Sequence, residues 1–262
     1  MSSLDVIHEY ADSLEKLLRL KTYPLAIKLL EKGEDVPDGA KRPVKDYGHR
    51  FITCQGFSES RRSGTTIVQM KEDMWCFEAA LGYGLIEPVT YFLEGNTRYP
   101  ESASTLQAGK NWAHAFPRLD YGKYIAIVSS PLEEAKFQPD LVMIYCNSVQ
   151  VTNLLMARTW IDGNEVTSTL SGHSGCVNSV VPVIKTRNCQ IAFPCWGDRR
   201  RAFAQDDEIV FSVPIEKVGD IIAGLRGLKN YGLGLPLVPN IPREPEMSPS
   251  YMKMAKMTGL HQ

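Results

Sequence analysis

Hydrophobic residues at the start of the chain recur at the spacing of an α-helix. Leu4, Ile7, Ala11 and Leu14 are separated mostly by charged residues, and this pattern covers residues 3–20. Such a helix has one apolar face that packs on a core. Similar patterns, together with start signals, predict helices at 149–163 and 215–228, and helices that begin near Cys54, Cys76 and Cys176.

Short apolar runs rich in β-branched residues predict the strands. These runs cover residues 23–31, 65–71, 123–130, 140–147, 189–194 and 207–214. Runs of this length and composition are typical of buried strands. Strands and helices interleave along the chain. The sequence therefore favours an α/β or α+β fold with a mixed sheet flanked by helices.

The pattern changes after residue 230, where prolines become frequent. They are Pro236, Pro239, Pro242, Pro245 and Pro249. Proline removes backbone donors and fixes an extended chain, so we expect one domain over residues 1–230 and an extended C-terminal arm over residues 231–262. The arm also carries apolar residues that need cover. We expect a homodimer in which the arm crosses the interface, with cover on its own subunit as the alternative.

Charge and composition exclude several classes of function. Lys plus Arg is 29 and Asp plus Glu is 30, a net charge of −1, which favours neither a nucleic acid nor a membrane surface as partner. No apolar run is long enough for a membrane span, and residues 1–20 do not resemble a signal peptide. We therefore expect a cytoplasmic protein, whose six cysteines are thiols or metal ligands rather than disulfides.

Four of the cysteines lie beside helix starts or glycine and proline turns. They are Cys54, Cys76, Cys176 and Cys195. A helix N-terminus lowers the pKa of a thiol and favours the thiolate, which is the form that binds metal. Their spacing is not that of a zinc ribbon, but four separate loops can converge on an iron–sulfur cluster or zinc. Cys146 and Cys189 lie within apolar strands and are expected in the core.

Several stretches of the chain resemble an uncharacterised family called domain of unknown function 169. They are YPLAIKLL, CQGFSESRRSG, MKEDMWCFEAALGYGL, QPDLVMIYCNSVQVTNLL, SGHSGCVNSVVPV and FPCWGDRRRAFAQDDEIVFSVP, which span about residues 20–228. The resemblance implies that cysteines recur at the positions of Cys54, Cys76, Cys176 and Cys195. In that family proline and glycine often follow the second cysteine, whereas Phe77 and Glu78 follow it here. The resemblance supplies no reaction.

A basic turn follows the last of these cysteines. Arginine forks bind carboxylates and phosphates, so we take His173, Asp198, Arg199 and Arg200 as the candidates that bind a small anion. In the alternative, Asp198 pairs with a neighbouring arginine and His173 is solvated. Arg61 and Arg62 are interpreted as a solvated helix face. The chain has no phosphate-binding loop, dinucleotide fingerprint or Ser-His-Asp arrangement.

The leading hypothesis is an iron–sulfur protein with one [4Fe–4S] cluster, for which an anaerobic host is suitable. It would act as a redox protein with a redox partner, or as a reductase or lyase on a small anionic substrate. The sequence leaves open whether it is an enzyme. The alternative is a non-catalytic protein that binds small anions and contains structural zinc or reduced thiols. A third hypothesis, thiol catalysis by Cys195, lacks an identifiable general base.

Overall fold

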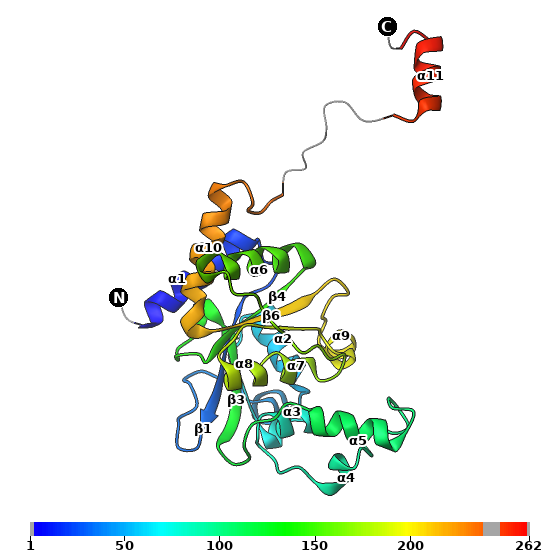
Figure 1. The fold of residues 1–262 in the computed structure, drawn as a ribbon. Coiled ribbons are helices and arrows are strands. Elements are labelled where there is room, and N and C mark those ends of the chain that lie inside the picture. Colours follow the sequence, from blue (N-terminus) through cyan, green and yellow to red (C-terminus); the bar gives the residue numbers. More distant parts are fainter. Residues whose placement is uncertain (1–2, 238–246, 261–262) are drawn as a thin grey trace.

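The computed structural model describes residues 3–237 and 247–260. Within residues 3–230, one sheet has helices on both faces (Figure 1). The six strands, in their order across the sheet, are β2 (Ile67–Met70), β3 (Tyr124–Pro131), β1 (Leu25–Glu31), β4 (Leu141–Cys146), β6 (Ile209–Pro214) and β5 (Gln190–Ala192). The prediction of a sheet flanked by helices is confirmed.

The strand directions differ from the mixed sheet that the sequence favoured. Each pair of neighbouring strands in this sheet is antiparallel, and the parallel pairings are the isolated bridges Lys41–Ile67 and Phe51–Met74. Continuous apolar strands are typical of parallel sheets because helices cover both faces. Here an antiparallel sheet is covered on both faces, so its strands have the same composition.

Strand β4 illustrates how the sheet divides the molecule into two cores. Met143 and Tyr145 belong to the hydrophobic cluster on one face, while Ile144 and Cys146 belong to the cluster on the other. This follows from the two-residue period of a strand. Cys189 lies in the same cluster as Cys146, so the prediction that these two cysteines are core residues is confirmed.

Three long helices cover the face of the sheet that contains Cys146. They are α1 (Ser3–Leu18), α6 (Ser148–Asp162) and α10 (Val218–Asn230), which lie together in Figure 1. Helices α6 and α10 approach closely at Gly224, where a Cβ atom would lie 2.3 Å from the carbonyl oxygen of Ala157. The absence of a side chain at Gly224 therefore permits this packing.

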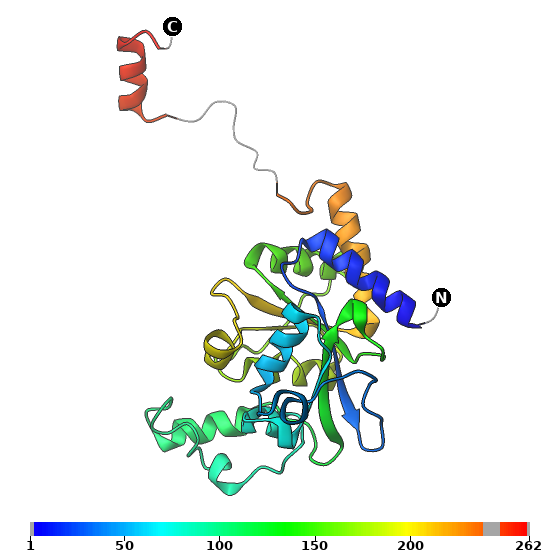
Figure 2. The ribbon, with the colours of Figure 1, turned by 180° about the vertical axis from the view of Figure 1, so that it is seen from behind.

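Shorter helices lie on the side of the opposite face, and those within residues 90–115, coloured teal, extend away from the sheet at the bottom of Figure 2. They are α2 (Thr53–Ser63), α3 (Phe77–Gly82), α4 (Thr90–Leu93), α5 (Leu106–Ala115), α7 (Gly175–Asn178), α8 (Val181–Thr186) and α9 (Trp196–Arg201). A π-helical turn lies at Pro43–Tyr47, and 3-10 turns lie at Lys71–Asp73, Leu132–Glu134 and Ile215–Lys217. Four of the helices, α2, α3, α7 and α9, begin at or next to a cysteine.

The C-terminal segment contains a last helix, α11 (Pro249–Met257). About a third of the extended arm predicted for residues 231–262 lies outside the described residues, including Pro239, Pro242 and Pro245, and residues 249–257 are helical rather than extended. The side chains of α11, among them Tyr251 and Met257, are largely exposed. Across the described part of the chain, no helix combines the length and apolar character needed to cross a membrane.

Candidate functional site

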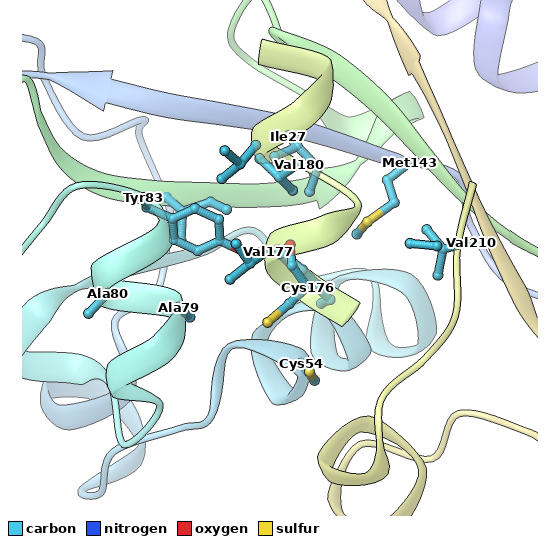
Figure 3. Close-up of a cluster of buried hydrophobic side chains, with 14 of the residues drawn as sticks. Ile27, Cys54, Ala79, Ala80, Tyr83, Met143, Cys176, Val177, Val180 and Val210 are labelled. Atoms are coloured by element: carbon cyan, nitrogen blue, oxygen red, sulfur yellow. Dashed lines mark hydrogen bonds between the residues drawn. The ribbon is translucent and has the colours of Figure 1, made fainter. Parts of the chain in front are cut away.

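Four cysteines from distant parts of the sequence line one cavity of about 310 Å³. Cys54 and Cys176 lie in the first turns of α2 and α7, and Cys76 and Cys195 immediately precede α3 and α9. Figure 3 shows Cys176 on α7 beside Cys54 at the start of α2. The fold therefore brings together the four cysteines that the sequence analysis singled out.

Two glycines allow the helix starts to approach one another. A Cβ atom on Gly175 would lie 2.4 Å from the carbonyl oxygen of Phe193 and 3.0 Å from the backbone nitrogen of Cys195. A Cβ atom on Gly82 would lie 2.5 Å from the side chain of Val177. A larger residue at Gly175 would push the Cys176 segment away from the Cys195 segment.

The four thiols differ in burial. Cys54 and Cys176 are each only 4% exposed, whereas Cys76 and Cys195 are partly exposed. All six cysteines of the chain are free thiols. The cavity therefore has a buried inner pair of sulfur atoms and an outer pair nearer to solvent.

The thiols share protons. A hydrogen bond from Cys54, followed by one from Cys76, holds the pKa of Cys176 well below its ordinary value. The pKa of Cys195 is lowered to about 7, first by Cys54 and also by the backbone N–H groups of Asp198 and Gly175. Contact with Cys176, together with burial, raises the pKa of both Cys54 and Cys76. The arrangement thus favours the thiolate, which is the form that binds metals, at Cys176 and Cys195, and the protonated thiol at Cys54 and Cys76.

The described side chains are not arranged around a single ion. Across residues 3–237 and 247–260, no three Cys, His, Asp or Glu side chains form a group that would hold one metal ion. Four sulfurs bound to one zinc at about 2.3 Å lie roughly 3.8 Å from one another. In a [4Fe–4S] cluster each thiolate binds a different iron, so the four sulfurs stand farther apart.

The other side of the cavity is polar. Arg98 Nη2 lies 2.8 Å from Glu78 Oε1, and the guanidinium lies 3.8 Å from the ring centre of Trp112. Ser174 Oγ donates a hydrogen bond to Glu78. His173 contacts Trp112 edge to face, and burial, followed by the charge of Arg98, lowers its pKa. The sequence analysis found His173 but missed Glu78 and Arg98.

The basic turn after Cys195 takes a different position from the one expected. Asp198 is buried and accepts a hydrogen bond of 2.9 Å from the hydroxyl of Tyr145. Burial, and then the negative charge of Cys195, raise the pKa of Asp198 to about 7, although the hydrogen bond from Tyr145 acts to lower it. Arg199 donates to the carbonyl oxygen of Gln205, and Arg200 is exposed. Within the described chain, the residues that line the cavity include His173 but not Asp198, Arg199 or Arg200.

The expectation that Arg61 is solvated is wrong. The sequence analysis interpreted it as part of a solvated helix face, but Arg61 is only 1% exposed. Its Nη1 and Nη2 atoms donate to the two carboxylate oxygens of Glu208 at 2.7 and 3.0 Å. The guanidinium also lies 3.9 Å from the ring centre of Tyr145. A buried chain of polar contacts therefore connects Glu208, through Arg61 and Tyr145, to Asp198.

Comparison with known proteins gives a family but no activity. The family model described as "DUF169: Uncharacterised ArCR, COG2043" matches residues 13–224. "Uncharacterized protein MJ0308" of Methanocaldococcus jannaschii is 25% identical over 228 residues, which cover 84% of this chain and 93% of that protein. No solved structure matches the chain. The resemblance inferred from the sequence is confirmed.

The packing of the cysteine segments is tested by Gly175→Ala, with Gly172→Ala in the same loop as the matched control. A Cβ atom at Gly172 would meet nothing within 4 Å. We expect Gly175→Ala to lower the free energy of unfolding by about 1–3 kcal/mol, because backbone atoms must move. Gly172→Ala should leave it within about 1 kcal/mol of the wild type. Urea denaturation measures both, and equal stabilities would contradict the described packing.

Proposed function

The chain belongs to the family described as DUF169, Uncharacterised ArCR, COG2043, and we propose that this member is a cytoplasmic iron–sulfur protein. One [4Fe–4S] cluster would be held by Cys54, Cys76, Cys176 and Cys195. The observation that carries the proposal is that all four cysteines line a single cavity although they lie on four different helix starts. The family description names no activity, so the argument depends on the site itself.

The donor set of the cavity fits such a cluster. Four cysteine thiolates are the usual ligands of a [4Fe–4S] cluster. Three of the sulfurs accept hydrogen bonds from backbone N–H groups: Cys76 from Ala79, Cys176 from Val177 and Cys195 from Asp198. Hydrogen bonds of this kind offset the negative charge of ligated sulfur and tune the reduction potential of a cluster.

The volume of the cavity is the observation that favours a cluster over a single zinc ion. A cavity of about 310 Å³ accommodates a larger group. The alternative is a non-catalytic protein that binds small anions and contains structural zinc or reduced thiols.

A cluster with four protein ligands supplies electron transfer, whereas a cluster with one open iron supplies a Lewis acid. The chain itself determines the side of approach. Cys54 and Cys176 are buried, so a redox partner or a small anionic substrate would reach the site past Cys76 and Cys195. The four cysteines would have to stay reduced to bind a cluster, which suits the cytoplasm, where thiols persist.

Alanine substitution of each cysteine, in anaerobically purified protein, tests the ligand assignment. We expect Cys54→Ala, Cys76→Ala, Cys176→Ala and Cys195→Ala each to lose most of the iron and the brown colour, because one of four ligands is gone. Cys146→Ala and Cys189→Ala are the controls, since both residues lie in the core on the other face of the sheet. Iron analysis and the visible spectrum are the measurements. Iron loss that is equal in the two groups, or a wild type without iron, would refute the assignment.

We also propose that the protein is a homodimer in which the segment 231–262 contributes apolar contacts across the interface. Support comes from the described part of this segment, where Tyr251, Met254 and Met257 are 64%, 57% and 72% exposed. Exposed apolar residues on one helix need a partner surface. Removal of residues 232–262 should convert the dimer to a monomer or an aggregate in light scattering. A truncated protein that stays dimeric would show that this segment does not hold the dimer.

A further inference from the structure

Three aromatic side chains surround the thiols of the cavity. Trp75 and Phe77 flank Cys76, and Trp196 follows Cys195. All three line the cavity, yet they remain 66%, 44% and 71% exposed. Large aromatic side chains gain stability from burial. Exposed apolar groups that gather at one concave site are a mark of ligand binding.

Arg98 is the one Lys or Arg side chain among the described residues that line the cavity. One face of its guanidinium stacks on Trp112, with Cζ 3.8 Å from the ring centre. Its Nη2 contacts Glu78 as an ion pair, but neither this atom nor Nε has a hydrogen-bond partner with good geometry among the described residues. A guanidinium carries five N–H donors, so Arg98 retains unused capacity for an acceptor.

Unlike Arg98, the carboxylate Glu78 in the same cavity already has hydrogen-bond partners. Glu78 accepts a hydrogen bond from Ser174 Oγ and pairs with Arg98. An entering cation would therefore compete with partners that Glu78 already has. An entering anion would be attracted to Arg98, whose Nε and Nη2 donors are buried and lack hydrogen-bond acceptors, and a planar carboxylate matches the fork of a guanidinium.

We propose that the mouth of the cavity binds a small planar carboxylate. Its ring would contact Trp75, Phe77 and Trp196, and its carboxylate would bind Arg98. The whole cavity has a volume of about 310 Å³, at the lower end of the roughly 300–1,000 Å³ of small-molecule sites. A cluster would occupy part of it, so the ligand is limited to at most one ring with its substituents. The anion is thus recognised from the loop that contains Arg98 rather than by Arg199 or Arg200. This inference deepens the proposed function and rests on it for the position of the ligand beside the cluster.

Calorimetric titration of the anaerobically purified full chain tests the ligand class. The probes are benzoate, benzyl alcohol, which keeps the ring and lacks the charge, and cyclohexanecarboxylate, which keeps the charge and lacks the planar ring. We expect saturable binding of benzoate, about tenfold or more tighter than that of either other probe, as the loss of a charge-assisted hydrogen bond or of stacking predicts. Equal affinities, or no saturable binding of benzoate, would overturn the proposal.

Four variants locate the site. Arg98→Gln should weaken benzoate binding about tenfold or more. Because this change also breaks the pair with Glu78, Trp196→Ala provides a second variant at a 71% exposed position, and it should weaken binding severalfold without unfolding the chain. Arg199→Gln and Tyr121→Ala are the controls for charge and for an exposed aromatic residue, and both should bind as the wild type does. Unchanged affinity in both Arg98→Gln and Trp196→Ala would overturn the proposal.

The iron content of the same samples separates this inference from the proposed function. Benzoate binding that depends on Arg98 in protein without iron would refute the cluster but support the ligand class. Protein that contains iron but does not bind benzoate would support the cluster and overturn the ligand class.

Discussion

The close approach of two backbone segments at Gly175 is the constraint on which the site depends. Gly175 allows the start of α7 to contact the segment from Phe193 to Cys195, and Gly82 allows α3 to pack against Val177. These contacts bring Cys76 and Cys195 to the edge of the hydrophobic core that contains Cys54 and Cys176. The cavity is therefore a consequence of backbone packing, since side-chain reach alone would not bring four helix starts together.

A buried polar chain reinforces the same arrangement. Asp198 belongs to α9, Tyr145 to β4 and Arg61 to α2, while Glu208 lies just before β6. Buried charges are stabilising only when they are well paired, and here Arg61 has a two-pronged contact with Glu208 and a face-on contact with Tyr145. These polar contacts connect helix α9, which begins after Cys195, to helix α2, which contains Cys54, through the central sheet. The glycine contacts hold the segments of Cys76, Cys176 and Cys195 together, whereas the polar contacts connect the segments of Cys54 and Cys195.

Local patterns predicted the strands and the longest helices. The same patterns placed Cys54, Cys76 and Cys176 at helix starts and Cys195 at a turn, where helix α9 begins in the structure. These local patterns could not predict contacts between residues that lie far apart in the sequence. Arg61 looks solvated in its own helix because its partner, Glu208, lies 147 positions further along the chain. Arg98 lies in a segment without clear periodicity, and its role depends on contacts with Glu78 and Trp112. Arg199 and Arg200 follow Cys195 in sequence, but successive helix residues point in different directions, so nearness in sequence did not place them at the cavity.

The proposed cluster would be held by thiols on one side of a cavity whose other side is aromatic and basic. The identity of this group is the central claim. The most direct test is the content of iron and acid-labile sulfide in the full chain purified without oxygen. The account predicts about four irons and four sulfides per chain. About one zinc per chain without sulfide, or protein free of metal, would contradict it.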